Sequence, residues 1–410
     1  MTAINYAIEE DSTARSTANS SYTKVGGSGV QEILGAELQA STDYVLIVSA
    51  IISGSSASAN DFEFIIYIDG VSVTTSYHRL EPRQTASSRG HQYFFIHRFT
   101  TTGTPGDIEF RMKTAGVNTA SNYDLYMLAI PVGELTSADF GYIEDTSDFT
   151  NVSSVAWVDT AATFTNPFDG TSDYLLCSFT HWEVDTPSDD LRMQVDLDGG
   201  STSVSSLQFE GEDNAEEYCF GDMVYLAAPA ATHDPLLQIR TTGDRGDCLH
   251  SALFYLRLNA FSDHFGTRDV TGVTLSATAT DYVVATATHT TDTTGAQDWI
   301  VGGSGIKTQT DNSKLTRRRV EDAVLGVLAG NNVDGILGNG TADVIGMPVF
   351  NVVSAVADAT SLDIDYVVVE VSDVSPNYDA DEASLWGFTP ELAVGGIIPY
   401  AAHHYTHNLG

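Results

Sequence analysis

One strand-and-turn pattern recurs in each third of the 410-residue chain, and this repetition limits the folds that the chain can adopt. Each third opens with a turn, an Asp-Tyr pair and a strand-like run, at Asp43-Tyr44, Asp173-Tyr174 and Asp281-Tyr282. The Asp suits an Asx-type turn, and the Tyr begins a buried strand. The three tyrosines therefore predict a common register for three structural units.

Alternating or β-branched runs dominate the sequence, for example at Phe62–Ile68 and Tyr366–Val371, and such runs are typical of strands. Clusters of Gly, Ser, Thr, Asn and Asp separate them, as turns require. Asp-Gly pairs, which favour hairpin turns, end two of these runs at Asp69-Gly70 and Asp198-Gly199. About eight short strands per unit predict an all-β chain of antiparallel β-sandwiches. A jelly roll is the favoured topology, and an immunoglobulin-like strand order fits the same periodicity.

The repetition predicts three tandem β-sandwich units with an extension at each end. The predicted segments are an N-terminal arm at 1–20, sandwiches at 21–134, 135–260 and 261–375, and a C-terminal tail at 376–410. Each sandwich is long enough to hold its own hydrophobic core. The arm is polar and lacks a strand pattern, whereas the tail is too apolar to be a free linker. We therefore expect the tail to pack on a neighbouring subunit or on a larger particle.

The chain is strongly acidic, with 55 Asp and Glu against 18 Lys and Arg and a formal net charge of −37. Such a surface repels nucleic acid and anionic lipid, because phosphate contacts need clustered basic side chains. An Asp-rich, Lys-poor composition is also similar to that of proteins from salty environments, where ionic screening reduces self-repulsion. Many secreted and particle-surface proteins are acidic as well, so both interpretations stay open.

Three cysteines, all in the middle third, are too few for a disulfide framework, and we expect buried thiols. The first residues show neither the basic segment nor the apolar run of a signal peptide. No stretch approaches the ~18 apolar residues of a membrane helix. The sequence therefore predicts a soluble chain that is made in the cytoplasm and inserts into no membrane.

The sharpest charge anomaly is a basic cluster within six positions of an otherwise acidic chain, formed by Lys314, Arg317, Arg318 and Arg319. This cluster suits the docking of an acidic partner or a neighbouring subunit. A solvated edge strand that is protected by its charge is the equal alternative. The apolar tail adds Trp386 and Phe388 as further candidates for partner docking.

The sequence contains no G-x-S-x-G, H-E-x-x-H, phosphate-binding or dinucleotide-binding motif, so we predict a non-enzymatic chain without a cofactor. The turns Asp196–Gly199 and Asn332–Gly335 place oxygen ligands beside Gly, which suits a structural Ca²⁺ or Mg²⁺. Plain turn chemistry is the favoured explanation of both. His403, His404 and His407 form a second candidate metal site, and a solvated tail is the favoured alternative.

Taken together, the chain resembles structural proteins of tailed-virus particles. The resemblance rests on the repeated Asp-Tyr openings, the Asp-Gly turns and the extended ends, over roughly residues 22–374. It implies a role on the virion surface, as capsid decoration or a head spike or turret, in a homotrimer that contacts other virion proteins such as the major capsid protein. The acidic bias points to a marine or halophilic host. The alternative is a host-recognition module of a tail fibre, in which one sandwich binds a surface glycan.

Overall fold

The computed structural model describes residues 2–55, 61–80, 90–114, 119–152, 156–184, 190–198, 203–210, 216–241, 246–275, 280–292, 295–308, 315–330, 336–337, 344–370 and 379–393. These residues form β-strands, turns and the short 3-10 helices η1 (Gly35–Glu37), η2 (Thr74–Ser76), η3 (Val132–Glu134) and η4 (Leu258–Ala260). The all-β class predicted from the sequence is confirmed. Within this part of the chain, no helix has the length and apolar character needed to cross a membrane.

The first repeat arranges eight strands in two antiparallel sheets. In chain order they are β2 (Ala7–Asp11), β4 (Glu32–Ile33), β5 (Asp43–Ser55), β6 (Phe62–Ile68), β8 (His78–Leu80), β9 (His91–Thr100), β10 (Ile108–Thr114) and β11 (Thr119–Pro131). When these strands are numbered 1 to 8, they pair in the orders 1-8-3-6 and 2-7-4-5. This is the strand order of a jelly roll.

The second and third repeats have the same strand order. Strands 1 to 8 of the second are β12 (Phe140–Asp145), β14 (Val158–Thr163), β15 (Tyr174–Val184), β16 (Asp190–Asp196), β17 (Ser203–Glu210), β18 (Glu217–Leu226), β19 (Leu236–Thr241) and β20 (Gly246–Arg257). Those of the third are β21 (His264–Asp269), β23 (Asp281–Thr290), β24 (Gln297–Thr308), β25 (Leu315–Asp322), β26 (Gly326–Gly330), β28 with β29 (Val344–Gly346 and Val349–Val356), β30 (Ser361–Glu370) and β31 (Asp379–Phe388). The sheets are extended by β3 (Arg15–Thr17), β7 (Val71–Ser72), β13 (Phe149–Val152), β22 (Val273–Thr274) and β27 (Ile336–Leu337).

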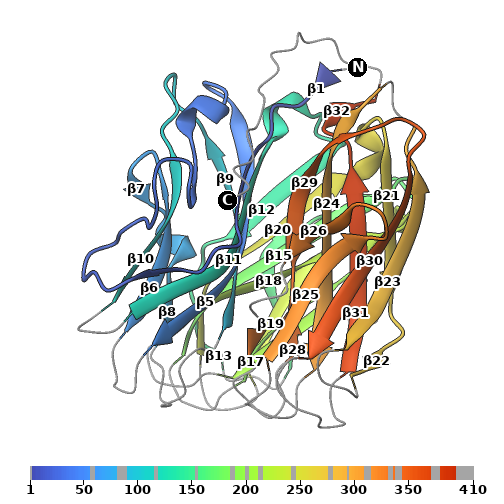
Figure 1. Ribbon diagram of the computed structural model, residues 1–410. Helices are drawn as coiled ribbons and strands as arrows, with labels where there is room; N and C mark the ends of the chain where they lie inside the picture. The colour runs from blue at the N-terminus through green and yellow to red at the C-terminus, as the bar shows by residue number, and fades with distance from the viewer. Residues whose placement is uncertain are drawn as a thin grey trace.

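The repeats join edge to edge through their sheets. In Figure 1 the blue first repeat and the orange and red third repeat lie on opposite sides, with the green second repeat between them. Strand 5 of the first repeat, β8, pairs with strand 6 of the second, β18, and β17 pairs with β28 in the same way. Between the third and first repeats the contact is by packing: β27 pairs with strand 4, β25, on the same edge as strand 5, β26, and lies against β9, which is strand 6. The three joints therefore close the repeats into a ring.

Strand 6 of each repeat reaches the centre of this ring. The side-chain amide of Gln92 on β9 donates a hydrogen bond to the backbone oxygen of Gly221 on β18 (2.8 Å). A Cβ atom on Gly346 of β28 would lie 2.7 Å from the same oxygen and 3.4 Å from the Gln92 amide nitrogen. Strands from three repeats thus meet at one backbone oxygen. The buried apolar side chains around them form one contiguous core.

Strands near both ends of the chain belong to the repeats, which corrects the prediction that the arm and the tail lie outside them. β2 is strand 1 of the first repeat and pairs with β11, and β31 is strand 8 of the third, between β21 and β24. β2 is polar because it is an edge strand, where charged side chains prevent further pairing. Beyond these strands, β1 (Thr2–Ala3) pairs with β32 (Glu391–Leu392). The predicted inner boundaries at 134/135 and 260/261 fall in the connections between repeats.

The third landmark tyrosine does not match the first two. Tyr44 and Tyr174 begin strand 3 of their repeats, and each hydroxyl accepts the backbone N–H of the residue five positions earlier (2.9 and 3.1 Å). Tyr282 lies at the start of β23, which is strand 2. The equivalent position in the third repeat is Trp299 at the start of β24, and its side chain is fully buried. The predicted register was wrong because the Asp-Tyr turn chemistry also precedes strand 2 there.

Candidate functional site: the joints between the repeats

A buried ion pair joins the third repeat to the first. Nη1 of Arg318 on β25 lies 3.0 Å from Oδ2 of Asp124 on β11, and the two side chains are 1% and 0% exposed. Asp124 also accepts a hydrogen bond from the Tyr126 hydroxyl (2.7 Å). The same hydroxyl accepts a hydrogen bond from the backbone N–H of Gly330 on β26 (2.9 Å). Because removing one partner would leave a charge in the core, this pair is costly to break.

The other members of the basic cluster differ in their surroundings. Arg319 forms ion pairs with Asp281 on β23 (2.8 Å) and with Glu321 (2.6 Å). Arg317 is half-buried, and Lys314 lies outside the described residues. The predicted docking of an acidic partner is therefore corrected for Arg318 and Arg319, because carboxylates of the same chain neutralise their charges.

Trp386 and Phe388 belong to the core of the third repeat. Both side chains are 0% exposed, and their ring centroids lie 6.1 Å apart. The Phe388 ring also lies 4.5 Å from the ring of Phe261, which follows the second repeat. A side chain without exposed surface cannot bind a partner, so the docking role predicted for these two residues is wrong. Their apolar character reflects their place in strand 8.

A second buried carboxylate connects the second and third repeats. Asp222 on β18 is 2% exposed and accepts hydrogen bonds from the hydroxyls of Ser205 on β17 (2.9 Å) and Ser304 on β24. Its Oδ1 also accepts the backbone N–H of Met223 (2.8 Å). Donors from two repeats thus hold one carboxylate, as a buried charge requires. Sequence reasoning missed Asp222 because aspartate is abundant throughout the chain.

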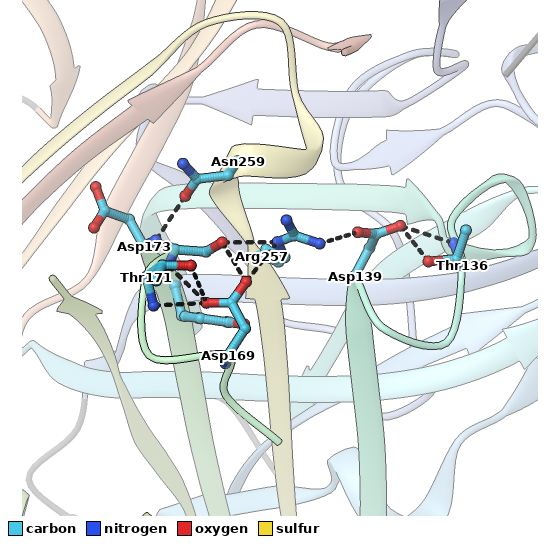
Figure 2. Close-up of polar contacts among 9 residues, drawn as sticks. Thr136, Asp139, Asp169, Thr171, Asp173, Arg257 and Asn259 are labelled. Atoms are coloured by element: carbon cyan, nitrogen blue, oxygen red, sulfur yellow. Dashed lines mark hydrogen bonds and ion pairs between the residues drawn. The ribbon is translucent and has the colours of Figure 1, made fainter. Parts of the chain in front are cut away.

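A polar network around Arg257, at the end of β20, fixes the linker between the first two repeats (Figure 2). The guanidinium lies 3.3 Å from Oδ1 of Asp139 in the linker and 3.5 Å from Oδ2 of Asp169 in the turn before strand 3. Its Nε donates to the Ser172 hydroxyl (3.0 Å). Burial raises the pKa of Asp169, but hydrogen bonds from Ser172 and Thr171 outweigh it and lower the pKa to about 2. Asp169 therefore stays ionised and binds the arginine at neutral pH.

An aspartate at the start of strand 3 contacts the following repeat at two of the joints. Asp173 of the second repeat has its Oδ2 3.5 Å from Nε2 of His264, the first residue of strand 1 in the third repeat. Asp298 of the third repeat accepts a hydrogen bond from the hydroxyl of Tyr6, just before strand 1 of the first repeat (3.2 Å). These contacts bridge the two repeats near the strand ends.

The first joint departs from this pattern. The pairing of strands 1 and 8 places Phe140 of β12 where the other repeats have Tyr6 and His264. A phenyl ring cannot bond to a carboxylate, and Asp43 instead pairs with Arg98 of its own repeat (2.8 Å). The Arg98 guanidinium lies over the Phe140 ring, 5.9 Å from its centroid, in the range of a cation–π contact.

The cysteines match the expectation of buried thiols. Cys177, Cys219 and Cys248 are free and buried. Burial raises the pKa of each thiol, which keeps it protonated at neutral pH. Because the thiolate is the reactive form, these residues act as small core side chains.

The structure describes one of the two candidate metal turns in part, from Asp196 to Asp198. Oδ1 of Asp196 accepts the backbone N–H of Asp198 (2.7 Å), which is plain turn chemistry. Among the residues that the structure describes, no three His, Cys, Asp or Glu side chains are grouped as metal ligands. Asn332–Gly335 and His403, His404 and His407 lie outside those residues, so a bound cation there stays a prediction.

No protein-family model matches the chain, and no curated protein sequence matches it. Among solved structures, the chain is similar to one described as the triple jelly roll fold and turret assembly of an archaeal virus, at 10% identity and a TM-score of 0.19, covering 93% of this chain and 90% of that one. The Gt strain of infectious bursal disease virus gives 8% identity and a TM-score of 0.24, over 61% and 73% of the two chains. Latent PorU from Porphyromonas gingivalis gives 10% identity and a TM-score of 0.22, over 83% and 34%. At these TM-scores, none of the three says what the chain does.

Proposed function

We propose that the chain is a non-enzymatic structural protein of a virus particle, which decorates the capsid or forms a head spike or turret. The observation that carries this proposal is the closed ring of three jelly rolls. Continuous sheets and a buried ion pair tie the repeats together, so that one chain supplies a rigid, three-part building block. The resemblance of the sequence to structural proteins of tailed-virus particles points in the same direction.

Such a block is expected to assemble with itself, as a homotrimer, and with other virion proteins such as the major capsid protein. Copies that each carry a net charge of −37 repel one another in dilute salt. Contacts between them therefore need ionic screening or cations at the interface. We expect assembly to strengthen with salt, as suits a virus of a marine or halophilic host.

Analysis of purified particles tests this function. Particles released from cells that produce the chain are banded in a density gradient, and their proteins are quantified by mass spectrometry. The chain should band with the capsid protein in a constant ratio, and antibodies against it should label intact particles. A chain that is absent from the particles, or present only in traces, contradicts the proposal.

A further inference from the structure

A groove with a volume of about 530 Å³ lies at the first joint. One wall comes from the start of β5 and the end of β9 in the first repeat, with Asp43, Arg98, Phe99 and Thr100. The other wall comes from β12 in the second repeat, with Tyr142 and Glu144. This is the joint at which strand 1 of the next repeat offers the strand-3 aspartate a phenylalanine, Phe140, in place of a polar side chain.

Two carboxylates and one guanidinium face this groove. Asp43 accepts hydrogen bonds from the Thr100 hydroxyl and from Arg98 (2.8 Å for Arg98), and these contacts lower the pKa of Asp43. The side chains of Asp43 and Arg98 are 33% and 42% exposed. Each oxygen of a carboxylate can accept two hydrogen bonds, so Asp43 keeps acceptor capacity for a ligand. Its position is fixed by its own strand partners.

Glu144 supplies the second carboxylate and is also held in place. It accepts a hydrogen bond from the Tyr142 hydroxyl (2.9 Å), and its Oε2 lies 3.4 Å from Nε2 of the buried His250. The close approach of His250 is the main cause that lowers the pKa of Glu144 to about 2. The Glu144 side chain is 40% exposed. Both carboxylates are therefore charged, oriented and open to solvent at neutral pH.

Aromatic rings stand beside these polar groups. The half-buried Phe99 stacks on Tyr44, with ring centroids 5.7 Å apart and an angle of 19° between the planes. Tyr142 is half-buried as well, and its hydroxyl is directed to Glu144. The groove thus combines rigid ring surfaces with preoriented acceptors and donors, as small-ligand sites do.

We propose that this groove binds a neutral carbohydrate. The C–H faces of a sugar ring pack on aromatic rings, while its neighbouring hydroxyls bond to planar carboxylates and guanidinium groups, and the groove offers both kinds of surface. Phosphates and acidic sugars are disfavoured, because two carboxylates outweigh one arginine that is already paired. This binding goes beyond the structural role and does not depend on it.

Saturation-transfer NMR on the full chain tests the site. The probes are the methyl glycosides of glucose, galactose, mannose and N-acetylglucosamine, with a lysine-containing tetrapeptide as the cationic alternative. At least one glycoside should receive saturation from the protein. Asp43→Asn and Glu144→Gln should each weaken its binding about tenfold, since a hydrogen bond to a charged group is lost. The matched control is Asp173→Asn at the second joint, which should leave the affinity within about twofold.

Three outcomes overturn the inference: no transfer to any of the four glycosides, equal transfer in the Asp43→Asn and Glu144→Gln variants, or binding of the tetrapeptide alone. Circular dichroism of each variant verifies that it is folded. Particle association is measured separately, so a failure of sugar binding and a failure of the structural role are distinguishable. A folded Glu144→Gln variant that joins particles but binds no sugar would separate the two functions.

Discussion

Arg318 and Asp124 hold opposite charges in a part of the chain that water does not reach. Arg318→Ala leaves the Asp124 carboxylate buried without its guanidinium, so we expect the free energy of unfolding to fall by about 3–5 kcal/mol. The double variant Arg318→Met, Asp124→Leu should lose less, because it removes both buried charges and keeps the volume. Urea titration followed by circular dichroism measures these differences.

Arg98→Ala is the matched control for this experiment. Arg98 forms an ion pair with Asp43, and the two side chains are 42% and 33% exposed. An exposed pair contributes at most about 1 kcal/mol to stability. If Arg318→Ala costs no more than Arg98→Ala, the buried pair does not hold the third joint together.

Glu9 on β2 gives the chain a pH dependence near neutrality. Burial raises its pKa from 4.5 to about 8, and nearby Asp11 and Glu37 act in the same direction. Between these two pKa values the folded chain keeps a proton that the unfolded chain has released. The free energy of unfolding therefore falls as the pH rises from about 4.5 to about 8. Burial lowers the pKa values of His78, His97 and His264, and these groups have the opposite effect, mainly below the ordinary value of 6.5.

Between pH 7 and 8 the Glu9 effect should thus be the largest among these groups. We expect the free energy of unfolding to decrease over this interval in the parent chain and to stay nearly constant in Glu9→Gln. Denaturant titrations at about pH 7.0, 7.5 and 8.0 measure the slope of the free energy of unfolding against pH. The same slope in both proteins would show that Glu9 is not the titrating group.

At the scale of the strand, the centre of the ring leaves no room for a side chain at position 221 of β18. A Cβ atom on Gly221 would lie 2.1 Å from the Ser178 carbonyl oxygen and 2.5 Å from the Phe94 ring. Gly221→Ala should destabilise the fold by at least about 1–3 kcal/mol through overpacking. Thermal unfolding measures the change, and Gly27→Ala is the control because a Cβ there meets no atom within 4 Å. A Gly221→Ala variant as stable as Gly27→Ala would contradict the close approach of β9 and β15 to β18.

Local sequence patterns were sufficient for the strand class and for the first two repeats. Tyr44 and Tyr174 open equivalent strands, because each follows the same turn and begins a buried run. The pattern failed where strand order matters, since Asp281-Tyr282 precedes strand 2 of the third repeat and periodicity does not encode pairing partners. Strand 1 of the first repeat and strand 8 of the third escaped detection for different reasons: β2 is polar because it is an edge strand, and β31 pairs with segments that are distant in the sequence.

The candidate site was anticipated only in part. The basic cluster stood out by its charge, but the partner of Arg318 is 194 positions away in the sequence. Alternation along β25 held an unused signal, because Arg318 shares its face with Thr316 and Val320, and all three are buried. A charged residue between two inward positions of a strand indicates a buried counter-charge.

At the scale of the whole chain, the N-terminal strands help to close the ring. Tyr6 bonds to Asp298, Glu10 accepts the side-chain amide of Asn351 (2.8 Å), and β2 pairs with β11. Deleting residues 1–11 should therefore lower the thermal unfolding midpoint and expose the third joint to limited proteolysis. An arm outside the fold would be dispensable. A truncated chain with the parent's midpoint and cleavage pattern would contradict the closed ring.

The chain forms three jelly rolls joined in a ring, and we propose that this ring serves as a building block of a virus particle. Electron cryomicroscopy of particles from producing cells tests it most directly. We expect surface density in which each copy shows three lobes, with sheets continuous across the first and second joints. Lobes that hinge independently, or particles whose density contains no copy of the chain, would contradict it.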